Sequence, residues 1–172
     1  SYKYTLRSKG NITVNGTLSA NKKAMIELES TLANAEYGIT VSSTGTFSWI
    51  GTYAVVQDYL GLTSVITPDA QITSVTQDGT KNGYIYLQDG SETNIQHAWI
   101  SYMGANSATK YGIYANAIDA GSGEGLSISN TFFKSNYDAL RLDNTTGAII
   151  YDSIFFANTH DGDFSPKVEL HK

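Results

Sequence analysis

The fold of this chain is decided by residues 84–102, YIYLQDGSETNIQHAWISY, which return 55 positions later as residues 139–157, ALRLDNTTGAIIYDSIFFA, without a gap. Apolar positions coincide in the two copies, so that Ile85 matches Leu140. Within each copy apolar and polar residues alternate at period two, as they do in half-buried β-strands. The repeat therefore predicts strands joined by a loop of constant length.

A third copy lies between these two, with strands expected at residues 112–115 and 128–133, and a weaker repeat relates residues 12–20 to residues 39–49. Self-similarity at such periods indicates a solenoid, whose units bury their apolar faces only by stacking. No linker separates a second domain. We therefore expect one all-β domain over residues 1–172, with weaker coils over 10–83, clear repeats over 84–162 and an extended tail over 163–172.

Composition narrows the class of protein further. The 172 residues are 41% apolar, which is enough for a sizeable core, and only 16% are charged. A net charge of -5 without a Lys/Arg cluster argues against a nucleic-acid partner. The absence of cysteine excludes disulfides and thiolate metal sites.

The sequence also bears on location. No apolar run approaches the roughly 20 residues that span a bilayer, and no signal-like segment opens the chain. We therefore expect a mature exported product, or a part of one, that is extracellular or at the cell surface. Three glycosylation sequons, at Asn11, Asn15 and Asn144, fit an exported surface.

Residues 21–37 admit two interpretations. Asn21 could cap a short helix that ends at Gly38, because apolar residues recur there at helical spacing. Alternatively, residues 25–28 form another strand of the solenoid. A short apolar run does not decide between these alternatives by its periodicity alone.

Three segments carry a resemblance to a known family: residues 12–20 (ITVNGTLSA), 126–136 (LSISNTFFKSN) and 149–158 (IIYDSIFFAN). The chain resembles the right-handed parallel β-helix superfamily, in particular the pectate-lyase-like repeats of exported bacterial and archaeal surface proteins. The resemblance implies parallel sheets of stacked coils. Lyases of this superfamily place an Arg or Lys beside calcium held by carboxylates, and polygalacturonase-like enzymes combine several Asp with Gly-His-Gly and Arg-x-Lys. Neither pattern is present, so we predict no enzymatic activity.

Stacked coils lie about 4.8 Å apart, so residues at equivalent positions should form columns along the axis. Asn side chains at bends can then bond to neighbouring backbone and to each other. We expect two columns in the core and two at bends: Ile128 with Ile150, Phe132 with Ile154, Asn130 with Asp152, and Asn136 with Asn158.

An alternative function is binding or cleavage of polysaccharide at an outer face. His97 aligns with the column of Asn130 and Asp152, where it is either part of a site or a variant rung of a structural ladder. Outward tyrosines suit stacking on sugar rings. The candidate glycan-binding residues are His97, Tyr86, Tyr151, Arg141 and Asp152.

Acidic residues are densest near the end of the repeats. Asp143, Asp161 and Asp163 could converge on Ca²⁺ through oxygen ligands, although loop carboxylates on an acidic surface are the commoner case. We predict no other cofactor and no other metal.

The charges are also unevenly placed along the chain. The first 23 residues include basic residues and no acid, whereas residues 138–163 contain five acids and one Arg. Head-to-tail contact would pair these ends. We therefore predict a non-catalytic exported structural subunit of a filament, sheath, surface layer or adhesin, whose partner is itself. The expected assembly residues are Lys3, Arg7, Lys9, Val168 and Leu170.

Overall fold

The computed structural model describes residues 4–31, 36–52, 69–77, 82–118, 125–165 and 169–171, with the backbone alone over 161–165 and 169–171. These residues form eighteen β-strands in three parallel sheets of six strands each. The described part of the chain contains no helix.

The three sheets are built from every third strand. Sheet A contains β1 (Tyr4–Ser8), β4 (Ala24–Leu28), β7 (Ala70–Ser74), β10 (Ala98–Ser101), β13 (Phe132–Lys134) and β16 (Ile154–Phe156). Sheet B contains β2 (Ile12–Val14), β5 (Gly38–Val41), β8 (Tyr84–Leu87), β11 (Ile113–Asn116), β14 (Asp138–Asp143) and β17 (His160–Ser165). Sheet C contains β3 (Thr17–Asn21), β6 (Thr46–Ile50), β9 (Glu92–Gln96), β12 (Leu126–Ser129), β15 (Ile149–Tyr151) and β18 (Glu169–His171).

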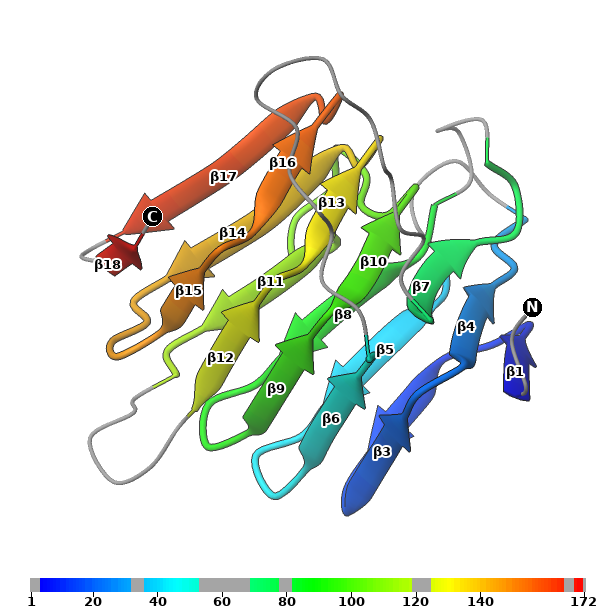
Figure 1. The fold of residues 1–172 in the computed structure, drawn as a ribbon, viewed down its shortest axis with the longest axis horizontal. Helices are drawn as coiled ribbons and strands as arrows, with labels where there is room; N and C mark the ends of the chain where they lie inside the picture. Colours follow the sequence, from blue (N-terminus) through cyan, green and yellow to red (C-terminus); the bar gives the residue numbers. More distant parts are fainter. Residues whose placement is uncertain are drawn as a thin grey trace.

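Successive strands visit sheets A, B and C in turn, six times, so each set of three strands forms one coil, from coil 1 (β1–β3) to coil 6 (β16–β18). Figure 1 shows the strands side by side, with β1 and β3 at one end and β17 and β18 at the other. This connectivity is compatible with a β-helix or another solenoid.

The core lies between the sheets and consists of rows of apolar side chains that run from coil to coil. In sheet A the paired residues of one row are Leu6, Ile26, Ile72, Ile100, Phe133 and Phe155. A second row in sheet C contains Ala20, Trp49, Ile95, Ile128, Ile150 and Leu170. The members in coils 2–5 are fully or almost fully buried. The side chain of Leu170, in coil 6, is not described.

The expected columns are confirmed as strand pairings, with one difference in orientation. Ile128 pairs with Ile150 in the core, as predicted. Phe132 pairs with Ile154, but both lie on the outer face of sheet A, because the neighbouring Phe133 fills the core. Two consecutive phenylalanines do not reveal which of them faces inward, and the period-two register sets that choice.

The ambiguous segment 21–37 is strand wherever it is regular in the described residues. Asn21 ends β3 and Ala24–Leu28 is β4, which pairs with both β1 and β7. The helical alternative is therefore wrong for these residues, since burial of Ala24, Ile26 and Leu28 follows period two. Residues 32–35 lie outside the described part. Residues 163–165 and 169–171, expected as a tail, belong to β17 and β18.

Candidate functional site

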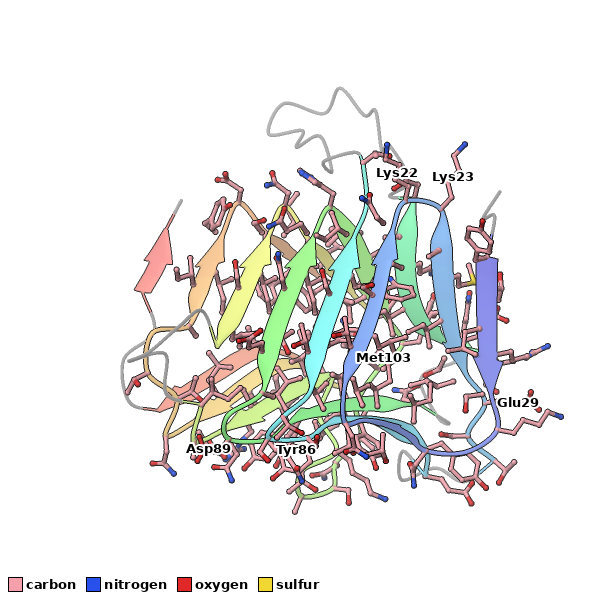
Figure 2. The ribbon with its side chains drawn as sticks, turned by 90° about the horizontal axis from the view of Figure 1, so that it is seen from below. Lys22, Lys23, Glu29, Tyr86, Asp89 and Met103 are labelled. Atoms are coloured by element: carbon pink, nitrogen blue, oxygen red, sulfur yellow. The ribbon has the colours of Figure 1, made fainter. Side chains whose placement is uncertain are left out.

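A row of large polar side chains crosses the outer face of sheet B. Tyr86 pairs with Tyr114, and Tyr114 pairs with Arg141, in three successive coils. Their orientation follows from the strands, since Tyr86 lies between the buried Ile85 and Leu87. The rings of Tyr86 and Tyr114 stack with centroids 5.3 Å apart and planes 12° apart. Figure 2 shows Tyr86 on the outside of the molecule.

Tyr114, the middle residue of this row, is covered by neighbouring side chains. The Tyr111 ring meets Tyr114 edge-on at 5.4 Å, and the Arg141 guanidinium lies 4.9 Å from the Tyr111 ring centroid. Arg141 Nε also contacts Asp143 Oδ2 at 3.1 Å. Burial, followed by the hydrogen bond to Asp143, raises the pKa of Tyr114 to about 12. Tyr114 is thus a neutral phenol at physiological pH and Arg141 is held by a carboxylate.

On its other side Tyr86 has smaller neighbours. In the adjacent strand Tyr86 pairs with Thr40, which pairs in turn with Thr13. These side chains are shorter than a tyrosine, so the sheet surface drops beside the ring. Tyr84, on the same strand, lies over Gly38, where a Cβ would come within 2.6 Å of its ring. Tyr86, Thr40 and Thr13 thus form a row on the outer face of sheet B, here called the ledge, in which a tyrosine ring stands beside threonine side chains.

The remaining predicted glycan residues lie elsewhere. His97, Asn130 and Asp152 occupy equivalent turns between sheets C and A, each with positive φ, at 49°, 47° and 49°. Backbone hydrogen bonds join these turns: His97 N donates to Ser129 O at 3.1 Å, and Asn130 N donates to Tyr151 O at 3.2 Å. The column is confirmed. Among the described residues, however, none of its three side chains hydrogen-bonds to another.

The structure therefore divides the five candidate residues between two places. Tyr86 and Arg141 share the outer face of sheet B, whereas His97, Tyr151 and Asp152 lie in sheet C or at its turn to sheet A. Sequence reasoning did not select Tyr114, Tyr111 or Asp143 as companions of Tyr86. The alignment of Ile85 with Ile113 was the signal that could have placed Tyr114 beside Tyr86.

The Asn column at the turns from sheet A to sheet B is structural, as expected. Asn136 Nδ2 donates to Asn158 Oδ1 at 2.9 Å and to Ile100 O at 3.1 Å, and Met103 N donates to Asn136 Oδ1 at 3.0 Å. Asn158 Nδ2 donates to Phe133 O at 3.2 Å. The amides thus satisfy backbone groups that a tight buried turn would leave without partners.

The acidic residues form no metal site in the described part of the chain. No group of three or more His, Asp or Glu side chains converges there. Asp143 contacts Arg141, and Asp138 Oδ1 lies 2.6 Å from His160 Nδ1. The structure does not describe the side chains of Asp161 and Asp163, so the calcium hypothesis stays a prediction.

The basic residues of coil 1 have partners in coil 2. Arg7 Nε lies 3.2 Å from Glu29 Oε2 and 3.8 Å from Glu27 Oε2, and Lys9 Nζ lies 3.3 Å from Glu29 Oε1. The charges of the first strand are thus partly balanced within the chain, which the sequence count of the first 23 residues did not show. Lys3 and Val168 lie outside the described residues. Leu170 pairs with Ile150 of the same chain.

Coil 1 leaves part of the core open, although its Val14 in sheet B is buried. Tyr4 and Leu6 stand in rows that face the core, yet they are 62% and 44% exposed. A hollow of about 300 Å³ lies there, lined among others by Tyr4, Leu6, Leu18, Ala20, Met25 and Trp49. Sequence reasoning did not identify this surface, because it began the coils at residue 10. The alternation over Tyr4–Ser8 was the available signal.

The sequons occupy exposed positions. Asn15 and Asn144 are exposed, and the exposed Asn11 already accepts a hydrogen bond from Gly38 N at 3.0 Å. Glycosylation at these positions stays a prediction. In the described part of the chain no helix has the length and apolarity needed to cross a membrane. Comparison with known proteins finds no match to a family model, to a curated protein or to a solved structure.

Proposed function

We propose that this protein is a non-catalytic structural subunit of an extracellular or cell-surface assembly, and that its three sheets form a right-handed parallel β-helix that stacks end to end. Right-handed crossovers between parallel strands are the strong rule, which supports that hand. The observation that carries the proposal is the open core of coil 1, where Leu6 in a core row is 44% exposed. Apolar surface of this kind is stabilised by a partner.

Two further features support a structural role. The acids that contact another ionisable group stabilise the fold, as Asp143 does with Arg141 and Asp138 with His160. The Asn column and the continuous core rows make a regular rod. The exposed sequons are consistent with export.

The test is the state of association of the purified protein. Light scattering after size exclusion should give a mass that rises with protein concentration, and electron microscopy should show filaments or ordered layers. A stable monomer at every concentration contradicts the proposal.

A second candidate function, glycan binding, is favoured by the ledge. Its tyrosine ring and threonine side chains offer stacking and hydrogen bonds to one sugar. Binding to a panel of neutral and acidic glycans, with and without Ca²⁺, should be lost in Tyr86→Ala and kept in Tyr151→Ala. Equal loss in both variants, or no binding by the wild type, rejects the ledge as a glycan site.

A further inference from the structure

We infer that coil 6 of one copy docks on the open coil 1 of a second copy in a fixed register, with Phe155 beside Leu6, so that each sheet continues across the contact. This inference rests on the proposed function and specifies its interface.

The first argument is the incomplete core of coil 1. Leu6 belongs to the row that contains Ile26, Ile72 and Ile100, and each of those three residues has no exposed surface. What distinguishes Leu6 is that only one coil covers it. An added coil would bury this side chain and fill the hollow beside it, gaining stabilisation in proportion to the apolar area removed from water.

The second argument is the shape of what can fit. At this end of the described solenoid the outermost strands are β1, β2 and β3, one in each sheet, and all the pairings in the sheets are parallel. A partner that pairs with all three must offer three strands with the same direction and spacing. Coil 6 of a second copy has this arrangement, because β16, β17 and β18 end the same three sheets.

The third argument is the register, which follows from extending the existing rows. In sheet A, Phe155 continues the row that starts at Leu6, so it should lie beside Leu6 of the second copy. In sheet C, Leu170 continues the row that starts at Ala20. In sheet B, Phe164 continues the row that starts at Val14.

Charge does not oppose this contact. Arg7 and Lys9 already have carboxylate partners in coil 2. Lys22 and Lys23 project from the turn between β3 and β4 (Figure 2), and Asp152 is exposed at the equivalent turn in coil 5. Copies that associate in this way present opposite surfaces to each other, and such a contact grows into an open filament rather than a closed dimer.

The test uses introduced cysteines, because the chain has none of its own. The register places Thr5 of one copy beside Ile154 of the next, both on the outer face of sheet A. Within one copy β1 and β16 are the outer strands of a six-stranded sheet, about 24 Å apart at roughly 4.8 Å per strand. A disulfide needs Cα atoms within about 7 Å, so it can form only between copies.

The double variant Thr5→Cys, Ile154→Cys should therefore give a ladder of covalent oligomers under mild oxidation, which a reductant should collapse to monomer. The matched control, Thr5→Cys with Ser127→Cys, moves the second thiol to the outer face of sheet C. It should give at most the dimers that random collision produces.

A second measurement removes the apolar contact. Leu6→Asp should abolish concentration-dependent association, while circular dichroism verifies that the fold is kept. The control Ser48→Asp, on the outer face of sheet C, should associate as the wild type does.

The outcomes separate the two proposals. If the wild type assembles but Leu6→Asp assembles equally well, or if both cysteine pairs give the same ladder, this interface is wrong and the proposed function stands. If the wild type stays monomeric and the Thr5→Cys, Ile154→Cys variant gives no ladder, both are overturned. A ladder specific to the Thr5 and Ile154 pair, with loss of assembly in Leu6→Asp, supports both.

Discussion

Coil 1 and the middle coils share the same core rows, but residues of one row differ in burial from coil to coil. In the sheet A row Leu6 of β1 is 44% exposed, whereas Ile72 of β7 in coil 3 is fully buried. Ile72 has a coil on either side and Leu6 has one. In this row burial thus depends on the neighbouring coils, because each unit contacts only the units next to it, whereas Val14 of coil 1 in sheet B is only 5% exposed.

The turns from sheet A to sheet B repeat this contrast with polar groups. Asn136 is 1% exposed and bonds to groups of the coils on either side, coil 4 and coil 6. Asn11, at the corresponding turn of coil 1, is exposed and accepts hydrogen bonds from Gly38 N at 3.0 Å and from Tyr84 Oη at 3.3 Å. Its partners therefore lie on one side only, whereas those of Asn136 lie on both.

The largest expected effect is the loss of a core side chain from a middle coil. Leu87→Ala should destabilise the protein by roughly 2–5 kcal/mol, because it leaves a cavity between two coils. Leu6→Ala should cost about 1 kcal/mol in dilute protein, since much of its surface already meets water. Urea unfolding measures both values. Similar losses would show that coil 1 is enclosed in solution.

A smaller effect is expected when the amide ladder is cut. Asn136→Ala should cost roughly 1–3 kcal/mol, because Met103 N and Asn158 Oδ1 lose a buried partner. Asn11→Ala should cost about 1 kcal/mol or less, since Asn11 is exposed and water can replace its bonds to Gly38 N and Tyr84 Oη. The same urea series gives both values, and the comparison breaks if Asn11→Ala proves as costly as Asn136→Ala.

The buried Tyr114 on the outer face of sheet B should make the stability of the protein depend on pH. Because burial and Asp143 raise the pKa of Tyr114 to about 12, the folded protein keeps this proton while the unfolded chain releases it from its usual pKa of 10.0. The contribution of Tyr114 is complete below pH 10 and is lost as pH rises toward 12, at most about 2 kcal/mol. Tyr114→Phe should lose less stability between pH 9 and 12 than the wild type. Equal slopes for the two proteins would contradict the assignment.

The smallest effect concerns backbone conformation, which should not depend on neighbours. Ala117 and Ala157 have positive φ, at 58° and 53°, in coils 4 and 6. A glycine adopts this conformation without the cost of a Cβ, so Ala117→Gly and Ala157→Gly should each stabilise by roughly 0.5–1 kcal/mol. Thermal unfolding would detect the gain. A gain in one variant only would mean that neighbouring coils also act on these turns.

Much of the strand architecture could be predicted because the repeat carries it. The match of Ile128 to Ile150 and of Asn136 to Asn158 fixed two columns that the structure contains. The predictions that failed concern the orientation or conformation of single segments. Phe132 and Phe133 are both large and apolar, and only the pairing register decides which one fills the core. Residues 21–28 showed helical spacing over one turn, but β1 and β7 on either side supply strand pairing.

The candidate site was harder to predict, because it joins residues from different coils. Tyr86 was predicted to face outward because it occupies a polar position in the period-two pattern of its strand. Its stacking partner Tyr114 lies 28 residues away and could be identified only from the pairing of β8 with β11. His97 and Asp152 were correctly placed in one column, yet alignment in a column did not bring their side chains into contact.

By itself the sequence determined that this chain is a stack of short strands, because a repeat of apolar positions leaves each unit an apolar face that only a similar unit can cover. The tertiary structure alone decided which of two adjacent phenylalanines lies in the core, which tyrosine stacks on Tyr86 and which side of Tyr86 has a threonine neighbour. It also decided that the basic residues Arg7 and Lys9 meet carboxylates of coil 2. The physical reason is that side-chain partners are set by the register between coils, which depends on all three sheets at once.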